Sequence, residues 1–183
     1  MTPNSILPNE MGRPFGRLPP IDLHYWSPDP DAEIPVHIMV TRISGFTDLR
    51  DLHWKLVWVV NVTEKDGDVQ IYHRRLEVVQ EIGCNHLTNW GAVTQVETAS
   101  SKRFNPRKVV ATMTLAQRQE LERLAAGVRV EEPNGVWNCQ DWIVTVLQQA
   151  EQAGLVTSNE WMAGCRLGKK WRRRIRAEFK CIT

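Results

Sequence analysis

Long apolar runs are missing from this sequence. Nowhere do about 18 consecutive apolar residues occur, so no membrane-spanning helix is expected. The first eight residues have neither a basic stretch nor an apolar core, which argues against a secretory signal peptide and predicts a cytoplasmic protein. Charge of one sign is not in excess either, since 23 lysines and arginines face 21 aspartates and glutamates. This balance indicates no polyanionic or polycationic partner.

Metal-binding and disulfide patterns are absent as well. The four cysteines are Cys84, Cys139, Cys165 and Cys181; no two of them form a Cys-x-x-Cys pair, and no His-x-x-x-His occurs. A structural zinc site is therefore not expected, and we predict neither metal nor cofactor. The cysteine spacings do not resemble a secreted disulfide framework, and without a signal peptide we expect reduced thiols.

The composition is that of one folded domain. Hydrophobic residues make up 42% of the 183 residues and charged residues 24%, both close to the average of globular proteins. Residues 1–31 hold seven of the ten prolines, which predicts an extended arm packed through Tyr25 and Trp26. Residues 32–165 are predicted to form the domain itself, and residues 166–183 a basic helix or tail.

The first half of the domain has strand patterns. β-Branched and aromatic residues predict strands at 36–43, 53–62, 69–82 and 91–96. The run 53–62 is nearly all apolar, as a strand buried on both faces would be. Asp66-Gly67 between the second and third strands predicts a hairpin turn. His73 on the return strand is expected to be a solvated strand residue.

The second half is helical by its periodicity, with helices predicted at 114–126, 140–153 and 158–165. Thr112 or Thr114 can cap the first of these helices, and a glycine ends each of the first two. The second helix, from Gln140 to Ala153, has the strongest apolar stripe. These elements predict an α+β fold in which an antiparallel sheet packs on a long amphipathic helix.

Cys139 stands directly before this strongest helix, with Asn138 as its candidate N-cap. The unpaired N–H groups and the dipole of a helix N-terminus favour negative charge, which suits a thiolate nucleophile and later an oxyanion. Asp141 in the first turn acts against this, because a nearby carboxylate favours the protonated thiol. The alternative is that Cys139 is a small buried hydrophobe.

A cysteine nucleophile needs a base within hydrogen-bond reach, and His53 at the head of an apolar strand is the candidate. With the turn at 66–67, the residue numbers of two directly opposite residues add up to 133, so His53 faces Gln80. The amide oxygen of Gln80 can then orient the imidazole. A shifted register or a longer loop offers Glu77 or Glu81 instead. The alternative for His53 is a capped core residue.

This arrangement resembles the circularly permuted, NlpC-like branch of the papain superfamily, which includes lecithin:retinol acyltransferase-like enzymes. It is most similar to small fungal proteins with a His-Trp strand and a Cys-x-x-Trp helix. The matching residues, within about 36–156, are His53-Trp54, Cys139-Gln140-Asp141-Trp142 and Ala153-Gly154. The resemblance implies a permuted papain-like fold with Cys139 as nucleophile, His53 as base and Gln80 as the orienting residue.

The chain also departs from that family. The Asn-Cys-x-x-Phe of the acyltransferase-like members is Asn-Cys-Gln-Asp-Trp here, and their second histidine has no counterpart. Thiol-dependent acyl chemistry by a hydrolase, acyltransferase or cyclase is the predicted function, on a small hydrophobic substrate of natural-product type. The alternative is a catalytically inactive protein of the same fold that binds or cyclises a small molecule non-covalently.

Three further features of the sequence bear on function. Eight tryptophans are present, and an aromatic substrate pocket is predicted from Trp54, Trp58, Trp137 and Trp142, with core packing as the alternative for each. The basic segment 166–180 has the composition of an RNA- or membrane-surface-binding module, although a solvated helix face is favoured and nucleic-acid binding is not expected. Cys84 and His86 form a weaker second Cys–His pair, and oligomeric state is left open.

Overall fold

The computed structural model describes residues 7, 9–41, 52–65, 67–97, 106–163 and 165. Within them, five antiparallel strands form one sheet in the order β6-β3-β2-β1-β7. Its strands are β1 (Ile34–Thr41), β2 (His53–Lys65), β3 (Asp68–Leu76), β6 (Val93–Glu97) and β7 (Arg107–Met113). A smaller sheet pairs β4 (Val78–Gln80) with β5 (Leu87–Asn89). With helices α2 (Leu115–Gly127) and α3 (Cys139–Gln152) and the 3₁₀ helix η1 (Leu23–Tyr25), the α+β class is confirmed.

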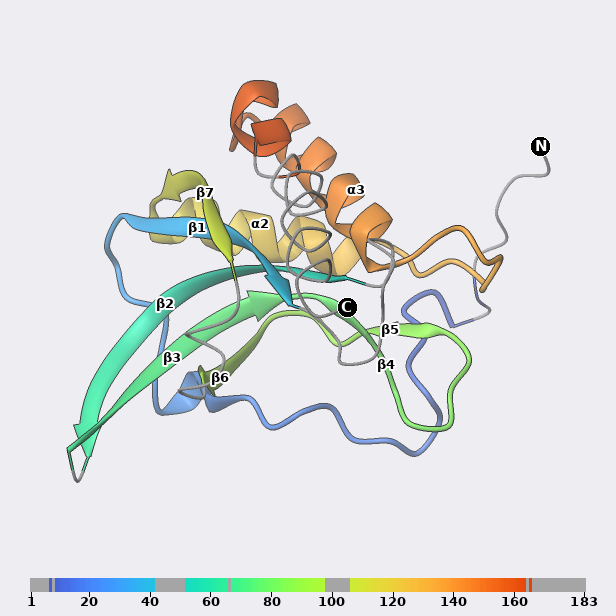
Figure 1. Ribbon diagram of the computed structural model, residues 1–183, viewed down its shortest axis with the longest axis horizontal. Helices are drawn as coiled ribbons and strands as arrows, with labels where there is room; N and C mark the ends of the chain where they lie inside the picture. The colour runs from blue at the N-terminus through green and yellow to red at the C-terminus, as the bar shows by residue number, and fades with distance from the viewer. Residues whose placement is uncertain are drawn as a thin grey trace, which may run out of the picture.

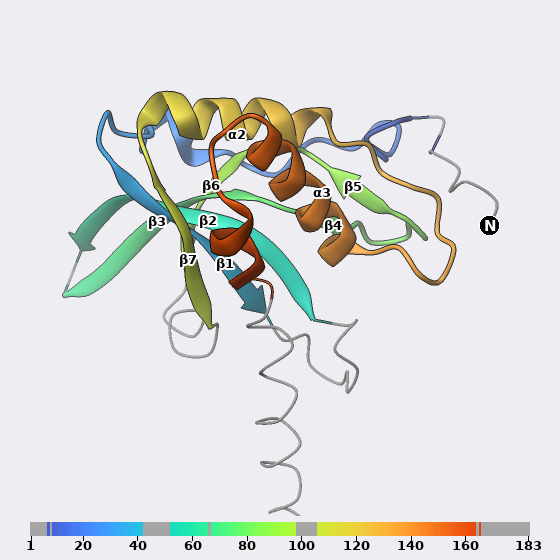
Figure 2. The ribbon, with the colours of Figure 1, turned by 90° about the horizontal axis from the view of Figure 1, so that it is seen from above.

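Both α-helices lie on the same face of the five-stranded sheet, as Figures 1 and 2 show. The core between them forms because alternate β2 side chains point toward the helices: Trp54, Leu56 and Trp58 are buried there. The apolar stripe of α3 covers them, with Ile143 and Leu147 wholly buried. The intervening β2 residues therefore lie on the opposite face of the sheet.

The helix ends follow the local sequence. Thr114, the second of the two predicted caps, closes a capping box with Gln117 at the start of α2. Asn138 caps α3 in the same way, and its backbone N–H donates to the Asp141 carboxylate at 2.9 Å. The predicted end of the α3 helix at Gly154 is also present, and the φ of 73° at this residue suits glycine.

The β2–β3 hairpin begins at the predicted turn, but its register changes along the ladder. The residue numbers of opposite residues add up to 133 near the turn, and to 132 beyond a bulge between Val59 and Asn61. The strand β3 then ends at Leu76, before the ladder reaches His53. The predicted pairing of His53 with Gln80 is therefore wrong. Instead, Gln80 lies on β4 and donates its amide to a backbone carbonyl, 2.8 Å away.

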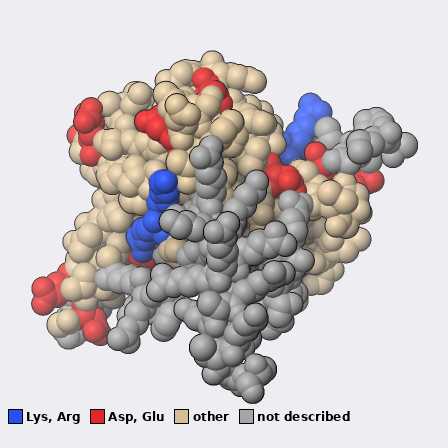
Figure 3. All heavy atoms as spheres, turned by 45° about the horizontal axis from the view of Figure 1, so that its top comes forward, with Lys and Arg blue, Asp and Glu red and all other residues tan. Residues whose placement is uncertain are grey.

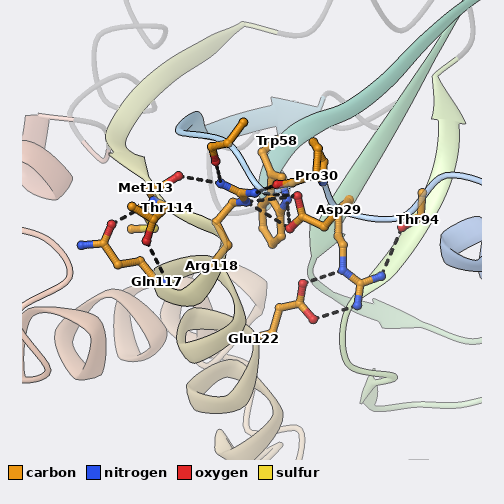
Figure 4. Close-up of polar contacts among 11 residues, drawn as sticks. Asp29, Pro30, Trp58, Thr94, Met113, Thr114, Gln117, Arg118 and Glu122 are labelled. Carbon is orange, nitrogen blue, oxygen red and sulfur yellow. Dashed lines mark hydrogen bonds and ion pairs between the residues drawn. The ribbon is translucent and has the colours of Figure 1, made fainter.

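The N-terminal arm is held by buried charges and not by its aromatic residues. Asp29 accepts from the guanidinium of Arg118 at 2.9 Å and from the indole N–H of Trp58 at 2.9 Å (Figure 4). Arg118 is fully buried, and its guanidinium also donates to the backbone carbonyl oxygens of Pro30, Ala32 and Met113. Tyr25 and Trp26, by contrast, are 86% and 70% exposed, so the predicted packing through them is wrong.

Some elements were not expected from the sequence. The strands β5 and β7 and the helix η1 were not predicted, whereas residues 158–163 are helical, within the predicted 158–165. The basic segment 166–183 and Cys181 lie outside the described residues. No helix in the described part of the chain is long and apolar enough to cross a bilayer. On the face drawn in Figure 3, the acidic side chains of the described residues are scattered and form no single patch.

Candidate active site

Cys139 and His53 meet where the first turn of α3 reaches the head of β2. His53 is the first residue of β2 and pairs with Thr41 of β1. The sulfur of Cys139 lies 3.7 Å from the carbonyl oxygen of Leu52, directly before His53. The amide of Gln140 donates to the same oxygen at 3.0 Å, which fixes the helix mouth against the strand. The two residues that the sequence proposes as nucleophile and base are thus neighbours.

The imidazole of His53 connects Cys139 to a carboxylate. Its Nε2 lies 2.6 Å from Oε2 of Glu77, the residue that directly follows β3. The Cys139 side chain also acts on this ring, since it raises the pKa of His53, and because Nε2 contacts Glu77, Nδ1 is the atom left for the thiol. The side chains of His53 and Glu77 are only 18% and 10% exposed. Cysteine, imidazole and carboxylate therefore form a continuous, largely buried chain.

Burial and hydrogen bonding oppose each other at this histidine. Burial alone lowers the pKa of His53, but the hydrogen bond with Cys139 and the hydrogen bond and charge of Glu77 outweigh it and raise the pKa to about 9. Burial raises the pKa of Glu77, but the hydrogen bond from His53 and the charges of Arg75 and His53 outweigh it and lower this pKa to about 2. At neutral pH the site therefore contains an imidazolium paired with a carboxylate.

Glu77 has a second partner, which fixes its carboxylate from the other side. The Nε of Arg75 lies 2.7 Å from Oε1, the oxygen that does not contact His53. The Glu77 carboxylate thus spans two cations, and its side chain has little freedom to leave the imidazole. An orienting carboxylate held in this way keeps the histidine ring aimed at the thiol.

The first N–H groups of α3 are accounted for except one. The N–H of Gln140 donates to the Asn138 side chain, and those of Asp141 and Trp142 donate to the Asn138 carbonyl oxygen. The N–H of Cys139 itself has no acceptor in the described part of the chain. A donor next to the sulfur, at the positive end of a helix dipole, is positioned to stabilise a developing oxyanion.

A cavity of about 350 Å³ lies beside the helix mouth. Its lining includes Trp137 and Asn138, the two residues before Cys139, together with His86 and Leu87 from the β4–β5 hairpin. Its lining mixes aromatic and aliphatic carbon with amide groups, as small-molecule sites do.

Of the four tryptophans predicted to line a substrate pocket, only Trp137 lies at this cavity. Trp58 and Trp142 are 0% and 1% exposed, and Trp54 is 7% exposed in the same core cluster. The prediction is therefore wrong for these three, because the alternation of β2 and the apolar stripe of α3 turn them inward. Core packing, the alternative given for each tryptophan, accounts for them.

The remaining candidates are placed elsewhere. The two ring nitrogens of His86 contact Asn85 and the carbonyl oxygen of Gly12, so the predicted weaker pair with Cys84 does not form. His73 is 5% exposed, so the expectation of a solvated strand residue is wrong. Glu81, the other alternative for orienting His53, contacts Trp90 and Arg17 instead.

Among the described residues, no group of three or more His, Cys, Asp or Glu is arranged to hold a metal ion. Compared with known protein families, curated proteins and solved structures, the chain matches none of them. The resemblance to the permuted papain-like branch therefore stays a prediction, and the case for function rests on the geometry of the site.

Proposed function

We propose that the protein is a thiol-dependent acyl-transfer enzyme in which Cys139 is the nucleophile, His53 the general acid and base, and Glu77 the residue that orients His53. The observation that carries this proposal is the row of side chains from Cys139 through His53 to Glu77, in which Glu77 lies 2.6 Å from His53 and Cys139 acts on the pKa of the same ring. Buried structural cysteines need no such chain, since they pack as small hydrophobes. The chain order of histidine before cysteine is also the order that the family resemblance implies.

The first half of the reaction uses the proton held by His53. The Cys139 thiolate attacks the carbonyl carbon of an ester, thioester or amide, forming a C–S bond and a tetrahedral oxyanion beside the Cys139 N–H. The oxyanion collapses and the bond to the leaving group breaks. The His53 imidazolium protonates that group, and the substrate acyl group remains on the sulfur.

The second half returns the enzyme to its starting state. Neutral His53 removes a proton from water or from another nucleophile, which attacks the thioester carbonyl. The C–S bond breaks, and Cys139 leaves as the thiolate beside the imidazolium. Hydrolysis, transfer and cyclisation differ only in the second nucleophile, which is water, a separate acceptor or a group of the same substrate. The cavity beside Trp137 and Asn138 is the proposed place for the acyl group, which suits a small and partly apolar substrate.

Thiol labelling tests the proposal, with a second cysteine of the same chain as internal control. Cys84 is partly exposed and reduced, whereas Cys139 is only 8% exposed. A packing role predicts that the alkylating agent iodoacetamide reacts faster with Cys84. An activated thiolate predicts that Cys139 reacts faster at pH 7 despite its burial, and that His53→Ala slows Cys139 at least tenfold without changing Cys84. If Cys84 is the faster of the two, the nucleophile assignment is wrong.

A further inference from the structure

A second cavity, of about 220 Å³, lies on the face of the central sheet away from the helices. Lys55 and Val57 of β2 line it, because they alternate with the β2 residues that face the core. His73 and Arg75 of β3 and Gln95 and Glu97 of β6 complete the polar part of the lining. Of these residues, only Arg75 also contacts the site proposed above, through its ion pair with Glu77.

The charged groups of this cavity are paired with one exception. Arg75 pairs with Glu77 at 2.7 Å, and Arg107 pairs with Glu97 at 3.1 Å. Each arginine therefore has a carboxylate partner, although Glu77 also pairs with His53. Lys55 is the remaining cation, and in the described part of the chain its ammonium has no hydrogen bond or ion pair.

His73 adds no charge that compensates Lys55. Burial is the largest cause that lowers the pKa of His73, to about 4, and the charges of Arg107 and Lys55 act in the same direction. At neutral pH the ring is therefore uncharged, although Glu97 lies 3.5 Å from its Nδ1. Its two ring nitrogens contact Arg107 and Glu97, each at 3.5 Å, so His73 forms part of the cavity wall without a charge of its own.

The surroundings of Lys55 are partly apolar and hold both signs of charge. Val57 and Met39, which also line the cavity, are each only 1% exposed, so part of the lining beside Lys55 is apolar. Burial lowers the pKa of Lys55, and the charges of Arg75 and Arg107 lower it further, against the opposite effect of Glu77 and Glu97. Lys55 is partly buried, and an anion in the cavity would supply a partner in a setting where charge pairing is stronger than in water.

We propose that this cavity binds a small oxyanion, a phosphate or a carboxylate group, with the Lys55 ammonium as its main partner. Arg75 is the second donor, since its guanidinium carries five N–H groups and its Nε, although 2.7 Å from Glu77 in an ion pair, has no hydrogen-bond acceptor among the described residues. The Glu97 carboxylate also faces the cavity, but Arg107 neutralises it. The volume is enough for an inorganic phosphate or a short carboxylic acid. This proposal holds whether or not Cys139 is a nucleophile.

The test is a titration of the full chain at constant ionic strength, with inorganic phosphate in one series and succinate in another. Lys55→Met removes the charge and keeps an unbranched side chain of similar length. Lys108→Met is the matched control, because Lys108 is exposed on β7 of the same sheet and its loss changes the net charge equally. We expect saturable binding of at least one probe, weakened tenfold or more by Lys55→Met and unchanged by Lys108→Met. The probe that binds more tightly identifies the chemistry of the anion.

A measurement on the unaltered protein keeps the test decisive if Lys55→Met fails to fold. With ¹³C-labelled lysine, the Lys55 side-chain resonance should shift on saturation with the bound probe, whereas the Lys108 resonance should not. The proposal is overturned if neither probe binds saturably at concentrations up to about 20 mM, a weak limit for a specific site. It is equally overturned if both variants lose affinity to the same extent, or if the two lysine resonances shift alike.

Discussion

Replacing Glu77 by glutamine tests how His53 is held. Glutamine keeps the shape of the side chain and one hydrogen-bond acceptor, but it removes the negative charge 2.6 Å from Nε2. The burial that lowers the pKa of His53 stays, and so does the hydrogen bond with Cys139. An adjacent opposite charge shifts a pKa by about 1 to 3. We therefore expect the pKa of His53 to fall from about 9 to near 7.

The same change alters how stability depends on pH. The pKa of His53 stands at about 9 against an ordinary 6.5, which corresponds to about 3 kcal/mol, counted once for the ion pair. Because this pKa is raised on folding, the stabilisation is complete below pH 6.5 and is lost as the pH rises through 9. The pKa of Glu77 is lowered to about 2, so its contribution is present above pH 4.5 and is lost as the pH falls toward 2. Glu77→Gln should remove most of the fall in stability between pH 6.5 and 9.

The assay is an NMR titration of the histidine ring carbons between pH 5 and 10, with His53 identified by its loss in His53→Gln. Urea unfolding at pH 6.5 and pH 9.5 supplies the stability difference. Gln80→Leu is the control, since Gln80 is the residue that the sequence placed opposite His53 and its amide instead contacts the carbonyl of Cys84. A pKa that stays near 9 in Glu77→Gln, or that falls equally in Gln80→Leu, would refute the assignment of Glu77.

Three further changes test the fold that positions the site. Asp29→Ala leaves the fully buried Arg118 without its carboxylate, and we expect a loss of about 3–5 kcal/mol in urea unfolding; a loss below about 1 kcal/mol would contradict the anchoring role of this pair. Asn138→Ala removes the N-cap of α3 and should cost about 1 kcal/mol, measured in the same way, while an unchanged midpoint would show that the cap is dispensable. Gly12→Ala places a Cβ against the carbonyl oxygen of Leu87 at a φ of 64°, whereas Gly16 has a similar φ and open space around it. The thermal unfolding midpoint of Gly12→Ala should therefore fall further than that of Gly16→Ala. Equal midpoints would count against this close contact.

The helices could be predicted from sequence because their signals are local. The capping box of Thr114, the Asn138 cap and the stop at Gly154 each depend on a few neighbouring residues. The strand β7 was missed because it begins with the polar pair Arg107-Lys108 and is stabilised by pairing with β1, some 70 residues earlier in the sequence. Pairing at that distance leaves little trace in local composition.

The candidate site was found in part for the same reason. Cys139 and His53 each carry a local signal, one at a helix mouth and one at the head of a strand. The orienting residue depends on register, and the bulge between Val59 and Asn61 shifts that register. Glu77 was named only as the product of such a shift, and sequence alone has no means of placing the bulge. The tryptophans show the same limit, since their number is visible in the sequence but the direction of each ring is not.

The most direct test of the proposed chemistry is to trap the acyl group on the enzyme. The full chain is incubated with p-nitrophenyl acetate at pH 7, quenched in acid and digested, and the peptides that carry the four cysteines are compared by mass spectrometry. We expect an acetyl group on Cys139, formed together with a burst of p-nitrophenolate and lost in His53→Ala and Cys139→Ser. Acetylation that is no greater at Cys139 than at Cys84, or that persists unchanged in His53→Ala, would contradict the proposal that Cys139 is a nucleophile activated by His53.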